Sequence, residues 1–133
     1  MKKIIILSAA ALTAGCMADP PMEMSAQAQS QLAVALDGRV AGPPRNCVPQ
    51  RDLRGNRSAG EGAIIFNTQS RDLIYVNRPA GGCPELDFGR ALKTRTTSTQ
   101  LCAGDIAEVF DPVSGVSSGA CGLGEFTPYR RVR

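Results

Sequence analysis

The fold of this chain is decided by residues 63–76, AIIFNTQSRDLIYV, in which two short apolar runs flank a polar turn. The runs 63–66 and 73–76 are rich in the β-branched and aromatic residues that are enriched in strands. Each run has the length of a strand, and the residues between them, 67–72, are typical of a turn. We therefore expect an antiparallel hairpin whose two faces are each partly covered by the rest of the chain.

Further segments with strand character follow towards the C-terminus. Residues 91–101 are rich in threonine and have no apolar stripe of helical spacing, and residues 106–110 end at an Asp-Pro pair. Residues 126–129 contain Pro128, which cannot donate to a central ladder, so we expect them to form an edge strand. Short strands at close spacing predict a mainly β fold, either a small antiparallel sheet or a partly open barrel.

A less apolar segment precedes the expected β region. Residues 17–31 are rich in Met, Ala, Gln, Ser and Pro and have the composition of a tether. Ser25 is placed to cap a short helix over residues 25–37. The sequence Ala41-Gly42-Pro43-Pro44 then interrupts regular structure. We expect a compact, mainly β domain over residues 45–133, preceded by a short helix or a disordered tether.

The N-terminus has the organisation of an export signal. Lys2 and Lys3 precede an apolar run, residues 4–12, that is too short to span a bilayer. The run ends in Leu12-Thr13-Ala14-Gly15-Cys16, which resembles the lipobox of bacterial lipoproteins, although Leu12 stands one place further from the cysteine than usual. An ordinary secretory signal cut near Ala18 is the alternative, and it would leave a soluble periplasmic protein.

The lipobox resemblance implies a signal peptide over residues 1–15 and palmitate-type acyl chains on Cys16. Residues 16–44 would then be a lipidated N-terminus and linker. Two or three acyl chains on one cysteine anchor a protein stably to a membrane. Met17, rather than Asp, follows the cysteine, which by the same resemblance implies the periplasmic face of the outer membrane rather than retention at the inner membrane.

The composition excludes several classes of function. The formal net charge of +3 falls to about +1 when Lys2 and Lys3 leave with the signal, so no overall basic field favours nucleic acid. The chain has no histidine, which excludes Ser-His, Cys-His and His-metal sites. It also has no Trp, two Tyr and four Phe, a poor supply of rings for stacking sugars or bases. We expect no cofactor.

Four cysteines remain after Cys16, namely Cys47, Cys83, Cys102 and Cys121. An even number in an oxidising compartment predicts two disulfide bonds. A zinc site is disfavoured because such sites use closely spaced cysteine pairs, and these four are widely spread. Four cysteines allow three pairings, and their spacing does not choose among them.

Three motifs resemble an uncharacterised family of small exported bacterial proteins, catalogued as a domain of unknown function. They are Tyr75-Val76-Asn77-Arg78-Pro79, Gln100-Leu101-Cys102-Ala103-Gly104-Asp105 and Gly122-Leu123-Gly124-Glu125-Phe126-Thr127-Pro128-Tyr129. The resemblance extends over residues 32–133 and implies no known activity.

The resemblance does bear on the pairing of the cysteines. The family includes versions with cysteines only at the positions of Cys47 and Cys102. That pattern implies the pairs Cys47–Cys102 and Cys83–Cys121. The nested alternative is Cys47–Cys121 with Cys83–Cys102.

Two groups of arginines are candidates for anion binding. The first, Arg51, Arg54 and Arg57, has a three-residue spacing that would form a ridge on a helix, but nearby glycines disfavour a helix. Contact with phosphate or anionic lipid headgroups is one interpretation, and a solvated surface is the one that the sequence favours. The second group is Arg130, Arg131 and Arg133, which we interpret as a frayed basic terminus.

Five carboxylates could supply acid–base chemistry or a calcium site: Glu85, Asp87, Asp105, Glu108 and Asp111. Paired carboxylates cleave glycosides, but the domain is small and nearly free of stacking rings, and no calcium-loop motif is present. Residues 119–124 are glycine-rich without the Lys-Ser/Thr of a phosphate loop, and Ser114, Ser117 and Ser118 have no base to activate them. We therefore assign no catalytic, cofactor-binding or metal-binding residue.

The sequence favours a non-enzymatic envelope lipoprotein, a structural or interaction module. Its partners would be the membrane, through the acyl chains on Cys16, and an envelope protein, with no role for nucleic acid. The alternative is a periplasmic inhibitor or ligand-binding module that presents residues 77–86, pinned at Cys83. A carboxylate-based hydrolase is the least favoured interpretation.

Overall fold

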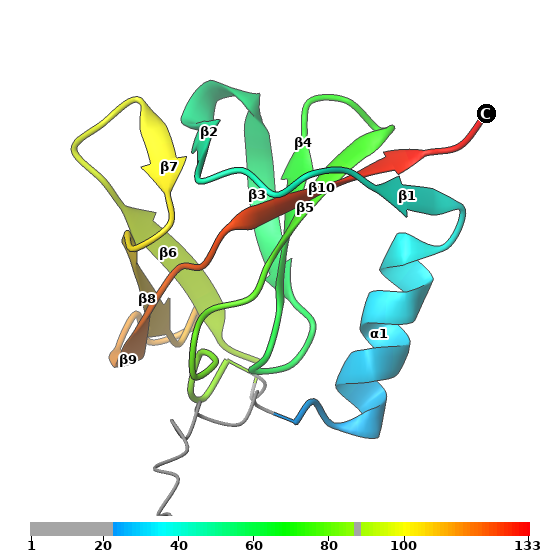
Figure 1. The fold of residues 1–133 in the computed structure, drawn as a ribbon. Helices are drawn as coiled ribbons and strands as arrows, with labels where there is room; N and C mark the ends of the chain where they lie inside the picture. Colours follow the sequence, from blue (N-terminus) through cyan, green and yellow to red (C-terminus); the bar gives the residue numbers. More distant parts are fainter. Residues whose placement is uncertain (1–22, 87–88) are drawn as a thin grey trace, which may run out of the picture.

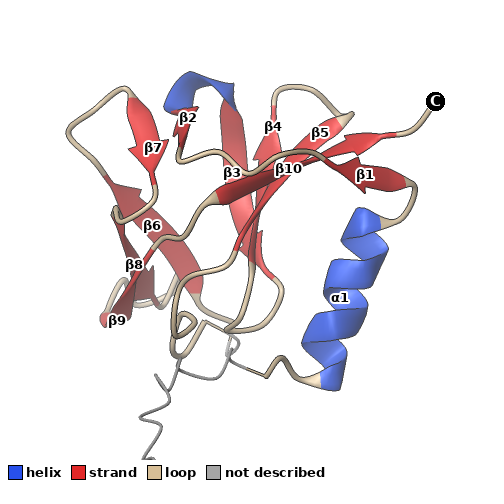
Figure 2. Cartoon of the chain, viewed as in Figure 1, coloured by secondary structure: helices blue, strands red, loops and turns tan. Residues whose placement is uncertain are grey.

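The structure is a computed structural model that describes residues 23–86 and 89–133. One helix, α1 (Ala26–Leu36), precedes a series of short strands (Figures 1 and 2). The strands are β1 (Arg39–Ala41), β2 (Cys47–Pro49), β3 (Leu53–Ser58), β4 (Ile64–Thr68), β5 (Leu73–Asn77), β6 (Ala91–Arg95), β7 (Gln100–Cys102), β8 (Ile106–Phe110), β9 (Ser117–Gly122) and β10 (Phe126–Arg131), with a 3₁₀ turn, η1 (Gln50–Asp52), before β3.

These strands form three antiparallel sheets. The central sheet has the order β1-β10-β5-β4-β3, and two smaller sheets consist of β2-β7 and β6-β8-β9. The expected hairpin is β4–β5, in which Phe66 stands opposite Tyr75. The fold is therefore mainly β, as predicted. Its sheets are open, so the alternative of a barrel does not apply.

One face of the central sheet packs against the smaller sheets. Phe66, Tyr75 and Phe126 lie on this face, and the ring centroids of Phe66 and Phe126 are 5.5 Å apart. Val48 of β2 and Val109 of β8 are fully buried against them. Each such side chain contributes about 1.5–3 kcal/mol when buried, so this face is the main hydrophobic core.

Helix α1 covers the opposite face of the central sheet (Figure 1). Its N-cap is Ser25, whose hydroxyl oxygen accepts the N–H of Ala28 at 3.1 Å. Leu32 of the helix is buried against Ile65 and Ile74. Because α1 packs on the sheet and β1 is its edge strand, the packed part of the chain begins near residue 24 rather than at residue 45. The helix has few apolar residues, so their spacing in the sequence does not by itself predict which face of the helix packs on the sheet.

Two disulfide bonds stabilise the smaller sheets. Cys47 and Cys102 face each other across β2 and β7, and Cys83 is bonded to Cys121 of β9. This is the pairing that the family resemblance implies, not the nested one. Disulfide bonds form and persist in oxidising compartments, so the chain has the chemistry of an extracytoplasmic protein.

Two strand predictions need correction. The expected strand over residues 91–101 is divided into β6 and β7, which belong to different sheets. The segment containing Pro128 is not an edge strand, because β10 lies between β1 and β5. The proline fits there because the ladder with β1 ends at the pair Ala41–Tyr129, next to Pro128, so no partner in β1 requires the missing N–H.

Within 23–86 and 89–133, no helix has the length and apolar character that crossing a bilayer requires.

Candidate functional site

The aspartates singled out in the sequence hold local structure. Asp105 accepts the backbone N–H of Cys102 at 2.8 Å. Asp111 accepts the N–H groups of Ser114 and Val113 at 3.1 and 2.8 Å, and these two bonds lower the pKa of its carboxyl below the ordinary value. Each aspartate therefore closes a turn. In the part of the chain that the structure describes, no three His, Cys, Asp or Glu side chains are grouped as a metal site would require.

Glu85 lies on an exposed turn and has a positive φ of 66°. Its backbone N–H donates to the carboxylate of Glu61 at 2.7 Å. Asp87 and the expected lipidation site Cys16 lie outside the described residues. The described carboxylates thus give no support to a hydrolase of the glycosidase type.

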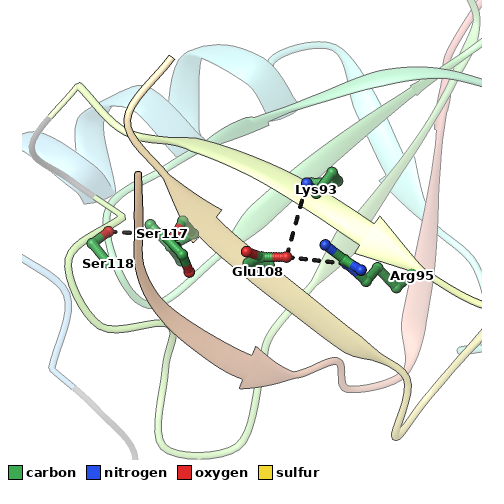
Figure 3. Close-up of polar contacts among 6 residues, drawn as sticks. Lys93, Arg95, Glu108, Ser117 and Ser118 are labelled. Atoms are coloured by element: carbon green, nitrogen blue, oxygen red, sulfur yellow. Dashed lines mark hydrogen bonds and ion pairs between the residues drawn. The ribbon is translucent and has the colours of Figure 1, made fainter. Parts of the chain in front are cut away.

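Glu108 is the centre of an ion-pair cluster on the outer face of the small three-stranded sheet (Figure 3). Its carboxylate lies 3.1 Å from the Arg95 guanidinium and 3.9 Å from the Lys93 ammonium, both on β6. The hydroxyl of Ser117 is the main cause of the lowered pKa of Glu108, and Lys93 and Arg95 add to it. The Lys93 ammonium also lies 5.6 Å from the ring centroid of Phe110. This arrangement keeps Glu108 ionised and joins β6 to β8.

Residues 117–122 form β9, a strand that the sequence analysis missed. Glycine, serine and alanine are poor strand formers, so the segment predicted only flexible backbone around a disulfide. The hydroxyl of Ser118 donates to the carbonyl oxygen of Val109 at 3.4 Å. The hydroxyl of Ser117 lies 3.5 Å from the same oxygen and also near the Glu108 carboxylate, and its single hydrogen serves one of these acceptors at a time. Both serines therefore link β9 to β8.

The segment proposed as a display loop, residues 77–86, is held against the domain. Asn77 is fully buried, and its side chain bonds to the backbone of Gly124. The N–H of Cys83 donates to the carbonyl of Glu61 at 2.7 Å, and Leu86 is buried in the main core. The segment is well fixed, but it buries its larger apolar side chains instead of presenting them.

Three arginines that are far apart in the sequence line one cavity beside α1, which we call the arginine cavity. Its volume is about 660 Å³, and it lies between the helix and the central sheet. The arginines are Arg39 of β1, Arg57 of β3 and Arg131 of β10. The other residues that line it are Ser30, Gln31, Val34, Ala35, Ser58 and Ile65.

The register of the strands explains why these arginines meet. Arg57 stands opposite Ile65, whose side chain is on the face that α1 covers, and Arg131 stands opposite Arg39. Arg131 follows Tyr129 by two residues, and alternate residues of a strand share a face. Tyr129 packs with the helix-side cluster, so Arg131 and Arg39 belong to that side as well.

Arg39 is the most firmly positioned of the three. Its guanidinium donates to the backbone carbonyls of Asp72 at 2.9 Å, Arg71 at 3.0 Å and Tyr129 at 3.5 Å. Burial lowers its pKa, the nearby charges of Arg131 and Arg57 lower it further, and Asp72 acts in the opposite direction. An arginine remains charged despite such shifts, so like charges are held together here.

The other members of the two arginine clusters point elsewhere. Arg51 pairs weakly with Asp52 at 3.8 Å, and Arg54 donates to the Gln69 side chain at 2.9 Å. Arg54 and Arg57 lie on strand β3, in agreement with the expectation that the nearby glycines disfavour a helix. Arg39 could not be recognised from the sequence, because only the register of β1 on β10 places it beside Arg131.

A second cavity of about 360 Å³ lies at the edge formed by β1 and β10. Tyr75 and Pro128 line it together with Arg45 and Arg130. The remaining lining residues are Val40, Ala41, Gly42 and Pro43. Adjacent residues Arg130 and Arg131 thus contribute to different cavities, as expected for neighbours in a strand.

No protein-family model, no curated protein and no solved structure matches this chain. The resemblance to a family of small exported bacterial proteins therefore stays a prediction.

Proposed function

We propose that this protein is a non-enzymatic binding module of the bacterial cell envelope, held at a membrane by acyl chains on Cys16. The observation that carries the proposal is the pair of disulfide bonds, Cys47–Cys102 and Cys83–Cys121. The first closes the two-stranded sheet of β2 and β7, and the second ties the loop that contains Cys83 to β9. Both suit a chain that folds outside the cytosol. The N-terminal signal would direct export of the chain, and the lipobox-like sequence would provide the lipid that anchors it to the membrane.

The arrangement of polar groups supports binding rather than catalysis. Asp105 and Asp111 close turns, and Glu108 is ion-paired on the outer face of its sheet. The chain contains no histidine to serve as a base. The cavities beside α1 and at the β1–β10 edge offer surfaces for a ligand or partner instead.

The proposed tether is short. Eight peptide units separate Cys16 from Met24, which lies just before α1 and packs against the helix-side cluster. Eight extended units reach at most about 30 Å. The domain would therefore stay close to the surface that carries its lipid. Met17 favours the outer membrane, and a soluble periplasmic protein cut near Ala18 remains the competing proposal.

Cell fractionation and intact-mass measurement test this proposal. We expect the native protein in the membrane fraction, with a mass raised by the acyl groups and lowered by the hydrogens lost in two disulfides. Cys16→Ser should abolish both acylation and membrane retention. Met17→Asp is the matched control, because it should preserve acylation while moving the protein to the inner membrane.

Two results would contradict the proposal. One is an unmodified Cys16 in native material, which would favour the soluble form. The other is a pair of free thiols among the remaining cysteines, which would remove the argument for export.

A further inference from the structure

We propose that the arginine cavity is a binding site for a phosphate-bearing ligand. The inference concerns the folded domain and does not depend on acylation of Cys16. It rests on three observations: an excess of positive charge at one cavity, the fixed position of one guanidinium, and a mixed polar and apolar lining.

The positive charge at the cavity is only partly offset. Among the described residues that line it, three are arginines and none is Asp or Glu. The carboxylate of Asp72, outside the lining, acts on Arg39, but it is also paired with the Arg133 guanidinium at 3.2 Å. Arg57 donates to a neutral partner, the Asn67 side chain, at 3.1 Å.

Like charges placed opposite each other in a sheet are destabilising, and Arg39 stands directly opposite Arg131. A protein that brings such groups together gains from a bound anion, because the anion removes their repulsion. Arg39 is held by three backbone carbonyls, so one guanidinium is already oriented. Preorganisation of this kind lowers the entropic cost of binding.

The number and type of donors favour phosphate over a simple carboxylate. Guanidinium groups bind both anions through paired N–H donors. However, a carboxylate has two oxygens and one charge, whereas a phosphate monoester has three free oxygens and up to two charges. Three arginines match the phosphate group better.

The cavity is also larger than one phosphate group. Its volume of about 660 Å³ leaves space for the rest of a small phosphate monoester. Ser30, Gln31 and Ser58 add neutral hydrogen-bonding groups, and Val34, Ala35 and Ile65 form an apolar wall. A phosphate ester with a small organic group fits that lining.

Calorimetric titration of the purified full chain, with Cys16→Ser to prevent acylation and with both disulfides intact, tests the proposal. Inorganic pyrophosphate is the soluble probe. We expect Arg57→Gln and Arg131→Gln each to weaken its binding about tenfold or more, since each removes a charge-assisted contact. Thermal unfolding of each variant verifies that it is folded.

Two matched controls have the same change of charge on the same strands. Arg54→Gln lies on β3 with Arg57, but its guanidinium is bonded to Gln69. Arg130→Gln lies beside Arg131 but lines the other cavity. Both controls should change the affinity by less than about threefold at constant salt. Equal losses in controls and cavity variants would overturn the proposal, because binding would then follow net charge alone.

A second arm identifies the source of the phosphate. Vesicles of phosphatidylcholine with phosphatidic acid, whose headgroup is a phosphate monoester, are compared with vesicles of phosphatidylcholine alone. Binding of the anionic vesicles that is lost in Arg57→Gln and Arg131→Gln would assign the cavity to lipid headgroups, and pyrophosphate binding without vesicle binding would assign it to soluble phosphates. No binding of either probe, or tighter binding of succinate than of pyrophosphate, would overturn the proposal.

Discussion

The side chain of Asn77 exchanges two hydrogen bonds with the backbone of Gly124. The amide nitrogen donates to the Gly124 carbonyl at 2.7 Å, and the amide oxygen accepts the Gly124 N–H at 2.8 Å. Through these two bonds the fully buried side chain of Asn77 links the end of β5 to the segment before β10, as a hydrogen-bonded backbone pair would. Gly124 has no room for a larger residue, since a methyl group there would meet the carbonyl oxygen of Arg78.

We predict that Asn77→Ala lowers the free energy of unfolding by about 3 kcal/mol, because it leaves the N–H and C=O of Gly124 without partners in a buried site. Urea denaturation followed by circular dichroism measures this change. Asn46→Ala is the control, since Asn46 is exposed, and it should change stability by less than about 0.5 kcal/mol. Equal stability of the two variants would contradict the role assigned to Asn77.

The two disulfides should differ in what they contribute. Loop entropy alone favours Cys47–Cys102 by about 0.3 kcal/mol, because it closes 55 residues and Cys83–Cys121 closes 38. However, Cys83 and Cys121 are buried in the main core, whereas Cys47 and Cys102 are partly exposed.

We therefore predict that replacing Cys83 and Cys121 by Ala destabilises the protein by at least about 1 kcal/mol more than replacing Cys47 and Cys102, because lost packing adds to a loss of about 4 kcal/mol from each cross-link. Thermal unfolding of the two double variants under oxidising conditions measures the difference. A larger effect at Cys47 and Cys102 would show that loop length outweighs burial.

The stability of helix α1 should depend on the burial of Leu32 more than on the helix propensity of its sequence. Leu32 is buried against the sheet, whereas Val34 on the same helix is 76% exposed. Leu32→Ala should cost about 2–3 kcal/mol, because it leaves a cavity against Ile65 and Ile74. Val34→Ala should change stability by less than about 0.5 kcal/mol. Hydrogen exchange of the helix amides would show whether α1 opens before the sheet, as we expect for Leu32→Ala.

The lowered pKa values of Glu108 and Asp111 predict how stability changes with pH. Their carboxyls are stabilised in the ionised form, below the ordinary values of 4.5 and 3.8. A group with a depressed pKa in the folded state contributes stability above its unfolded pKa and loses it as the pH falls through the folded pKa. The contribution of both groups is therefore complete at neutral pH, begins to fall below about pH 5 and is lost in stronger acid.

Thermal midpoints measured from pH 7 to pH 2 test this dependence. Glu108→Gln and Asp111→Asn should each reduce the midpoint at pH 7 and make the decline in acid shallower. Glu125→Gln is the control, because its exposed carboxylate has no hydrogen bond or ion pair among the described residues. An unchanged pH profile in the first two variants would contradict the structural role of these carboxylates.

The parts of the fold that the sequence predicted are those with local signals. The hairpin of β4 and β5 has two dense apolar runs around a polar turn, and β8 ends at an Asp-Pro pair. Ser25 caps α1 as expected, because its hydroxyl and the following N–H groups are close in sequence. Such signals do not require knowledge of distant partners.

The parts that the sequence did not predict depend on pairing between distant segments. Strand β9 is formed from poor strand residues, and its partner β8 and the bond to Cys83 place it. The arginine cavity requires β1, β3 and β10 to share a sheet, so no spacing in the sequence could reveal it. The position of Pro128 within the sheet likewise depends on where β1 stops.

The place of β10 between β1 and β5 has a consequence for the order in which the molecule is built. The first strand of the chain, β1, pairs with the last, β10, which also pairs with β5. Neither β1 nor that edge of β5 therefore has its partner until the C-terminal residues have been synthesised. Up to that moment the growing chain exposes two unpaired strand edges, which invite association with neighbouring chains. A product that ends before residue 126 would keep both strand edges unpaired. Although only slightly shortened, it would be an aggregation-prone fragment and a target of cellular quality control.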